Sequence, residues 1–205
     1  MQAQESDESL MERYQAGDPV AFEALLRRYR APIFGLLHRC VGERARAEDL
    51  LQETWLRVVA AAPRWEPRAR VRTWLYAIAR NLAVDEARRG GHRPRPTADP
   101  EGNAPDGPDT LPSDDLPPDR GADSALLRPK LEAALAALPA EQREVFVLRE
   151  YAGVPFQEIA QITGAPEATV KSRMRYALEG LRRKLAELGV TPEHTGAAGA
   201  RSTST

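Results

Sequence analysis

The sequence predicts an all-α protein made of two small helical domains joined by a disordered linker. Apolar residues recur at helical spacing in several segments, and no segment carries a convincing strand pattern. A stretch dense in Pro, Gly and Asp, with almost no large apolar residues, separates the two sets of helices and cannot bury a core. We expect a disordered tail over 1–6, a domain over 7–90, an acidic Pro-rich linker over 91–123, a second domain over 124–188 and a polar tail over 189–205.

The overall composition limits location and cofactors. The 205 residues carry a formal net charge of −1, so binding to nucleic acid would depend on a local basic surface. Cys40 is the only cysteine, which excludes a disulfide within the chain, and we expect a buried structural thiol rather than a metal ligand. The N-terminus is acidic and polar, and no apolar run approaches the roughly 20 residues that span a membrane. We expect a cytoplasmic protein with no membrane insertion and no metal or cofactor.

Four helices are expected in the first domain. A short helix comes first, and Asp18 with Pro19 then begins a second helix, which Pro32 kinks and Gly42 ends. A third helix over about 45–62 has an apolar inner stripe and a charged outer face. The stripe contains Leu50, Leu51, Thr54, Trp55, Val58 and Val59, and the outer face contains Glu48, Asp49, Gln52, Glu53 and Arg57.

An arginine-rich loop and a fourth helix complete this domain. The loop over 63–70 holds Trp65, whose ring either offers a stacking surface or folds onto the core. The fourth helix, over about 71–89, is expected to bury one side and expose the other. Its buried side contains Val71, Trp74, Leu75, Ile78 and Leu82, and its exposed side contains Arg72, Tyr76, Arg80 and Asn81.

The second domain is expected to end in a helix-turn-helix over 155–185, after a helix that Pro139 opens. Gly164 tolerates the left-handed conformation at a sharp helix end, and Pro166 begins the next helix well. Ala160 and Val170 place a small and a branched apolar residue where two steeply crossing helices need them.

The second helix of this motif has an apolar and a basic face. The apolar stripe contains Val170, Met174, Ala177, Leu178, Leu181 and Leu185. We expect Ser172, Arg175 and Tyr176 to reach base edges, and Thr169, Lys171, Arg173 and Arg183 to reach phosphates or groove flanks. The alternative is the solvated basic face of an ordinary surface helix.

Three stretches together resemble the extracytoplasmic-function sigma factors, the minimal two-domain members of the bacterial sigma-70 family. They are AEDLLQETWLRVV over 47–59, VRTWLYAIARNLAVDEARR over 71–89, and a stretch over 138–185 that contains TVKSR. The resemblance covers nearly everything except the linker and the two tails, and its motifs are specific as an ordered set.

The resemblance implies a chain that binds RNA polymerase core, brings it to promoters and begins to melt the DNA. The first domain would be sigma region 2, docking Glu48, Asp49, Gln52, Glu53 and Arg57 on core and reading the −10 element. The −10 contacts would come from Arg64, Trp65, Arg68, Arg70, Arg72, Tyr76, Arg80 and Asn81, because a flipped base needs stacking planes and polar groups. The second domain would be region 4, reading the −35 element as duplex.

Two further partners follow from the resemblance. The family is usually held inactive by an anti-sigma factor, often a membrane protein. In the family the linker threads through the basic polymerase cleft and RNA exit path, where an acidic strand would act as a mimic of RNA. A solvated tether is the alternative for the linker.

Two other classes of protein fit parts of the pattern. A response regulator or repressor shares the C-terminal motif, but needs a receiver or ligand domain that the first two stretches do not make. A helical nuclease or hydrolase needs a phosphate-binding Gly loop, metal spacing or a completed carboxylate site, and the close acids of the third helix lack partners for one. The sequence favours a sigma factor with no catalytic residues of its own.

Overall fold

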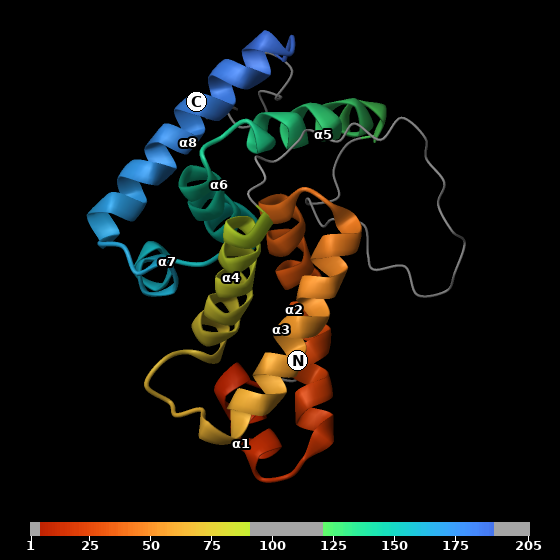
Figure 1. Ribbon diagram of the computed structural model, residues 1–205, viewed down its shortest axis with the longest axis vertical. Coiled ribbons are helices and arrows are strands. Elements are labelled where there is room, and N and C mark those ends of the chain that lie inside the picture. Colours follow the sequence, from red (N-terminus) through yellow and green to blue (C-terminus); the bar gives the residue numbers. More distant parts are fainter. Residues whose placement is uncertain (1–4, 91–120, 191–205) are drawn as a thin grey trace, which may run out of the picture.

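Helices account for the regular structure of the described residues, which are 5–90 and 121–190 of a computed structural model (Figure 1). For Gly90 and residues 121–126 only the backbone is described. Most of the expected linker and of both expected tails lies outside these ranges, and so does the hypothesis that the linker mimics RNA.

The helices fall into two groups. The first group is α1 (Asp7–Gln15), α2 (Pro19–Val41), α3 (Arg44–Ala61), the 3-10 helix η1 (Ala62–Arg64) and α4 (Val71–Gly90). The second group is α5 (Gly121–Ala136), α6 (Ala140–Phe146), the π-helical segment η2 (Val147–Tyr151), α7 (Phe156–Thr163) and α8 (Glu167–Glu187). The helix boundaries lie within a few residues of those that the sequence predicts.

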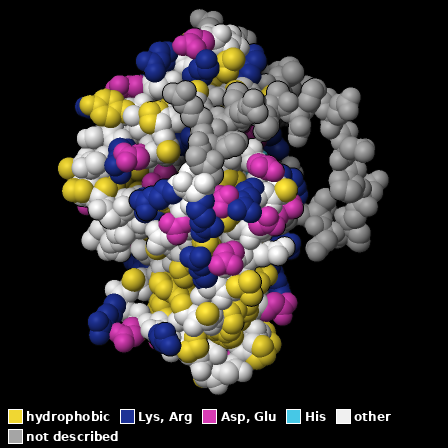
Figure 2. All heavy atoms as spheres, in the orientation of Figure 1, with side chains coloured by type: hydrophobic (Ala, Val, Ile, Leu, Met, Phe, Trp, Pro, Cys, Tyr) yellow, Lys and Arg dark blue, Asp and Glu magenta, His cyan; other side chains and the backbone are white. Residues whose placement is uncertain are grey.

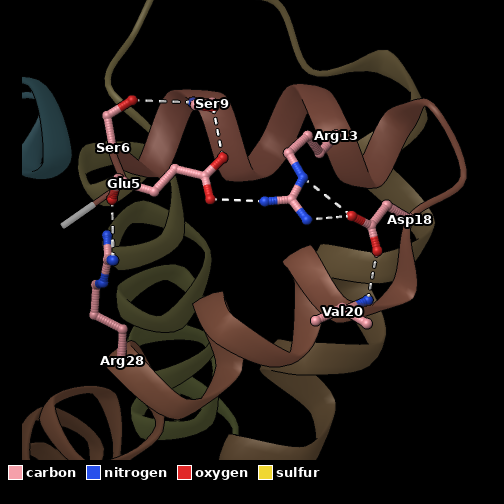
Figure 3. A network of polar contacts seen from close by, with 7 residues as sticks. All are labelled: Glu5, Ser6, Ser9, Arg13, Asp18, Val20 and Arg28. Atoms are coloured by element: carbon pink, nitrogen blue, oxygen red, sulfur yellow. Dashed lines mark hydrogen bonds and ion pairs between the residues drawn. The ribbon is translucent and has the colours of Figure 1, made fainter. Parts of the chain in front are cut away.

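A network of polar contacts fixes α1 against the start of α2 (Figure 3). Ser6 caps α1 by accepting a backbone N–H bond at 3.2 Å, and Asp18 caps α2 by accepting one from Val20 at 2.9 Å. Arg13 joins the two caps, because its guanidinium pairs with Glu5 at 2.7 Å and with Asp18 at 2.5 Å. Arg28 of α2 donates to the carbonyl of Glu5 at 3.1 Å, so the network joins the start of α1 to α2.

The second helix, α2, begins and ends at the residues that the sequence predicts. It runs without interruption through Pro32 and ends where Gly42 adopts a left-handed conformation with φ +78°. The N–H of Gly42 donates to the carbonyl of His38 at 2.8 Å, which satisfies one of the last carbonyls of the helix.

The core of the first group follows the predicted stripes, with exceptions in α3 and α4. Val58 is buried, whereas Val59 is 42% exposed, because a step of about 100° turns it away from the neighbouring helices. Trp74, predicted to lie in the core, is only partly buried. Tyr76, predicted to be exposed, is only 1% exposed, and its ring packs edge-on against Tyr29 of α2.

Helices α7 and α8 form the predicted helix-turn-helix. Gly164 ends α7 in the left-handed region, with φ +68°, and Pro166 directly precedes α8. Val170 is fully buried and Ala160 partly buried in the core that α7 and α8 share. Leu178 was expected in the apolar stripe but is 37% exposed, because it lies about 100° away from the buried Ala177.

The two groups pack against each other, and α4 lies at the centre of the contact (Figure 1). Helix α7 contacts α4, and α6 and η2 contact α2. This arrangement places the predicted DNA-contacting side of α4 against the second group.

The turn of the helix-turn-helix generates a stability prediction. Replacing Gly164 by alanine places a β-carbon in the left-handed region and should lower the free energy of unfolding by about 1–2 kcal/mol. No atom lies within 4 Å of the added carbon, so the loss reports on backbone conformation and not on a clash. Urea unfolding followed by circular dichroism measures it. Gly164→Asn is the control and should lose less, because asparagine tolerates this region; equal losses would contradict the explanation.

Candidate nucleic-acid interface

A pocket of about 450 Å³ opens where the loop after η1 meets the start of α1. Its lining is formed by Asp7, Glu8, Pro67, Arg68, Ala69, Arg70 and Arg72. Glu8 Oε1 accepts the first N–H of α4, from Val71, at 3.2 Å. Gln15 Nε2 donates to the carbonyls of Ala62 at 2.7 Å and Trp65 at 2.9 Å, which fixes η1. The pocket is large enough for a small ring system, and its arginines offer planar stacking surfaces and donors.

The structure decides between the two alternatives for Trp65. Its side chain is only 7% exposed and belongs to the core, so the indole is no stacking surface here. Arg64 and Arg68 are exposed, and Arg68 pairs with Glu66 at 2.7 Å on the surface of the loop. Asn81 is also exposed and accepts a weak hydrogen bond from Arg80 at 3.4 Å. The planes that the loop offers to a base are therefore guanidinium groups.

The prediction that one stripe of α4 is exposed is wrong in this structure. Arg72, Tyr76 and Arg80 lie four residues apart on this stripe, and the second group covers it. Arg72 donates a fork to Glu158 of α7 at 3.1 and 3.3 Å, and Arg80 donates to Glu144 of α6 at 2.6 Å. Tyr76 lies between these two arginines along the helix, and its ring packs edge-on against Tyr29 of α2, with the ring centres 6.2 Å apart.

Glu158 is buried at this contact and remains a carboxylate. Thr73 Oγ1 donates to it at 2.7 Å, and Arg70 lies 3.6 Å away. Burial alone would raise the pKa of Glu158, but the hydrogen bonds from Thr73 and Arg72 outweigh burial and hold the pKa below its ordinary value. The charge is therefore stable only while these donors are in place.

A third polar contact crosses between the groups at the end of α2. Arg143 of α6 is buried and donates to the carbonyl of Arg39 at 3.3 Å and to that of Leu138 at 3.3 Å. A cation is favoured there because the last carbonyls of a helix carry partial negative charge.

Nearby, burial raises the pKa of the Cys40 thiol to about 12, and the charge of Glu144 adds to the effect. Cys40 thus lies close to α6.

The outer face of α3 combines charge with exposed apolar side chains. Asp49, Gln52 and Arg57 are exposed, and Glu48 and Glu53 are half-buried. The helix also presents Leu56, which is 67% exposed, and Val59, which sequence analysis placed in the core. Figure 2 shows hydrophobic side chains gathered over α3 and the adjoining ends of α1 and α2. An apolar centre with a charged rim is typical of a protein interface.

The basic face of α8 is compact and accessible. Lys171, Ser172, Arg175 and Tyr176 are exposed, and they form two pairs spaced four residues apart. The Arg175 guanidinium lies 4.9 Å from the centre of the Tyr176 ring and donates to its hydroxyl at 3.1 Å. Thr169 and Arg173 are half-buried beside them.

The structure does not bring every predicted residue of α8 to this face. Arg173 is held by Glu141 at 2.5 Å, so it is already paired with an acid of α6. Arg183 is exposed, but lies about 12 Å further along the helix than Arg175 and lines a separate groove with Tyr176.

Comparison with known proteins identifies the family. Residues 25–93 match the family model for sigma-70 region 2, and residues 128–181 match that for sigma-70 region 4. The chain is 32% identical to the RNA polymerase sigma-H factor of Pseudomonas aeruginosa over 192 residues, which cover 92% of this chain and 98% of the relative. It is 35% identical to the ECF RNA polymerase sigma factor SigL of Mycobacterium tuberculosis over 177 residues, or 86% and 95% of the two chains. The chain belongs to the extracytoplasmic-function group of the sigma-70 family.

A solved structure agrees with this sigma-factor fold. The sigma factor RpoE of Bartonella quintana, in complex with the anti-sigma factor NepR, superposes with a TM-score of 0.60 at 25% identity. The match covers 80% of this chain and 96% of that one.

Sequence reasoning missed several residues that shape the interfaces of this sigma factor. Asp7 and Glu8 were given no binding role from the sequence, although both line the pocket. Glu144 and Glu158 were also given no role, although both are buried and pair with arginines of α4. For Leu56 one signal was available, since a leucine on the polar side of a helix indicates a contact surface.

The described residues carry neither a spanning helix nor a metal cluster. Within 5–90 and 121–190, no helix combines the length and apolarity that crossing a membrane requires. Over the same ranges, no three His, Cys, Asp or Glu side chains gather where they would hold a metal ion.

The lowered pKa of Glu158 predicts that acid weakens the contact between the groups. The carboxylate stabilises the contact above its ordinary pKa of 4.5, and this stabilisation is lost as the pH falls through the lower value in the packed state. Small-angle scattering should show the radius of gyration increasing below about pH 4.5, with circular dichroism reporting that the helices persist. Glu158→Gln cannot titrate and should lack this step. An acid-induced expansion of the same size in that variant would contradict the assignment.

Proposed function

We propose that this sigma factor divides promoter recognition among three surfaces. Region 2 within 7–90 would bind core polymerase and the −10 element, and region 4 within 124–188 would bind the −35 element. The residues 91–123 would join them as a linker, with tails over 1–6 and 189–205. The observation that carries this proposal is the relationship to sigma factors over 92% of the chain, including α3, α4 and the helix-turn-helix.

The core-binding surface is the outer face of α3. Arg57 pairs with Glu53 at 2.9 Å, and Arg44 pairs with Glu48 at 3.0 Å, so the charges are ordered along the helix. Charges at the rim of an interface mainly speed association and fix the orientation of the partner, and they add less to the affinity. The exposed Leu56 and Val59 supply the apolar area that a stable contact needs.

The −10 surface is the pocket of the loop together with α4. A flipped base would enter the pocket beside Arg68 and Arg70, whose guanidinium planes and donors suit a base and its phosphates. Arg72, Arg80 and Asn81 would continue the surface along α4. Trp65 and Tyr76 are assigned supporting roles in the core instead of direct contacts, because both are buried.

The −35 surface is the exposed face of α8. Arg175 and Ser172 lie where the first turns of a recognition helix meet base edges in the major groove. Lys171 and Arg173 flank them and would contact phosphates, as would Thr169. Tyr176 holds the Arg175 guanidinium by stacking and hydrogen bonding, which orders the base-reading group.

Regulation and location follow from the same assignment. The superposition on a sigma factor bound to an anti-sigma factor supports control of this chain by an anti-sigma factor, which the family resemblance allows to be membrane-anchored. The chain would act in the cytoplasm, where core polymerase and promoter DNA are, without inserting into a membrane itself. It would contribute recognition alone, and the polymerase would supply the catalytic chemistry.

Run-off transcription with purified core polymerase tests the function, and Leu56 tests the surface. The wild-type chain should give a discrete transcript from its own promoter.

Leu56→Ser should weaken core binding at least about tenfold, because an exposed apolar anchor is lost, while stability changes by less than about 0.5 kcal/mol. Leu178→Ser, an exposed leucine of α8, is the control and should bind core normally. A wild-type chain that neither binds core nor opens any promoter would refute the function.

Substitutions in α8 separate base reading from phosphate binding. Arg175→Ala should cost about 1–3 kcal/mol on the correct −35 sequence and much less on a scrambled one, because a base contact is lost. Lys171→Ala should weaken both duplexes about equally and flatten the dependence on salt. Equilibrium binding at several salt concentrations measures both effects. Equal losses for Arg175→Ala on the two duplexes would show that Arg175 reads no base.

A further inference from the structure

We propose that helix α1 positions the −10 loop (residues 65–70, between η1 and α4) by holding both of its ends. Gln15 binds the first end and Glu8 the second, so these side chains act on DNA through the loop and need not touch it. Helix α1 precedes residues 25–93, the stretch that matches the family model for region 2. The inference rests on the proposed role of the loop in −10 binding, and it adds two positioning residues outside the matched stretch.

The −10 loop has no buried side chain between its ends. Residues 66–70 are all exposed, whereas Trp65 and Val71 on either side are buried. A segment without buried side chains gains too little from packing to offset the conformational entropy that ordering it costs. Arg70 lies 3.6 Å from Glu158, but that contact is to region 4 and does not hold the loop on region 2. The placing of the loop arginines therefore depends on what holds the two ends.

Gln15 binds two backbone carbonyls at the first end. Its Nε2 donates to the carbonyl of Ala62 at 2.7 Å and to that of Trp65 at 2.9 Å. The Trp65 N–H also donates to the Ala62 carbonyl, at 3.0 Å, so the amide of Gln15 spans the turn that this bond closes. A side-chain amide has two N–H groups, and both find acceptors on this one turn. Gln15 thus fixes the direction in which the chain leaves η1.

Glu8 caps α4 at the second end. Its Oε1 accepts the N–H of Val71, the first residue of α4, at 3.2 Å. The first N–H groups of a helix have no partner within the helix, and a carboxylate is also favoured there by the helix dipole. The cap comes from α1 and not from the loop itself, so it fixes where α4 begins relative to α1.

Helix α1 is itself fixed on α2. Leu10 and Met11 are buried in the hydrophobic core. Asp7, the neighbour of Glu8, pairs with Arg28 of α2, and Figure 3 shows the further polar contacts that join the start of α1 to α2. Asp7 and Glu8 thus bind different helices, and α1 connects the −10 loop to α2.

Three alanine variants of one helix test the positioning role. Glu8→Ala and Gln15→Ala remove the two contacts with the loop ends, whereas Glu12→Ala changes an exposed residue between them. Alanine favours the helix about equally at the three positions, so helix propensity does not separate the variants.

The measurement is equilibrium binding of holoenzyme, made from core polymerase and each full chain, to a fork-junction DNA. The DNA carries the −10 element, mapped from the protein's own transcripts, as an unpaired non-template strand. Glu8→Ala and Gln15→Ala should each bind it at least about fivefold more weakly than the wild type, which is the effect of about one lost hydrogen bond. Glu12→Ala should bind as the wild type does.

A conservative variant and an altered DNA separate positioning from a general loss of structure. Glu8→Gln keeps an oxygen that can accept the Val71 N–H, so it should restore most of the affinity. The second DNA lacks the one −10 base whose removal costs the wild type most. On it the difference between Glu8→Ala and the wild type should largely vanish, because the loop then has no base to hold. A variant that is only unstable would lose the same factor on both DNAs.

The outcomes distinguish this inference from the proposed function. Wild-type affinity in Glu8→Ala and Gln15→Ala would overturn the inference, even when the wild type opens its promoter. Equal losses on the intact DNA and on the DNA that lacks the base would overturn it as well, and so would a Glu8→Gln variant as weak as Glu8→Ala. A wild type that opens no promoter with core refutes the proposed function, whatever the variants of α1 do.

Discussion

Two buried glutamates of region 4 pair with two arginines of one helix of region 2 where the regions of this sigma factor meet. Removing a carboxylate from water costs several kcal/mol, and only good donors offset that cost. Arg72 and Thr73 surround Glu158, and Arg80 meets Glu144, so the closed arrangement depends on these donors. The same arginines are the groups that a DNA backbone would need. In this structure both arginines are committed to carboxylates of region 4.

The remaining surfaces are individually small, which explains why the function needs a polymerase. The face of α3 presents few exposed apolar side chains, the pocket holds about 450 Å³, and the basic face of α8 spans two turns. Each surface supports a modest affinity by itself. Placed together on one chain, they act at high effective concentration once the first is bound.

Sequence reasoning was most reliable where a local conformational rule decides the structure. Gly42 and Gly164 end helices in the left-handed region, and the helix-turn-helix follows from the residues that Gly164 separates. The pattern was less reliable at helices that contact more than one neighbour. Tyr76 was predicted to be exposed but is buried, and its ring packs edge-on against Tyr29 of α2. Glu144 and Glu158 carry no sequence signal, since only the fold shows what they face.

Ion pairs are one part of the interdomain contact, which also joins α2 to η2, where Val147 and Leu148 are buried. A wholly apolar contact of the same extent would expose two hydrophobic surfaces to water whenever the regions separate, and such surfaces promote aggregation. Here the glutamates gain hydration on opening, and the arginines gain phosphates when DNA is present, so each state satisfies its own charges. Opening the contact costs free energy and so lowers the apparent affinity of any ligand that needs the open form. DNA, core polymerase or an inhibitor would each change the balance by binding one form more tightly. An inhibitor that binds the closed form strengthens a preference already present in the chain, which needs less binding energy than imposing one.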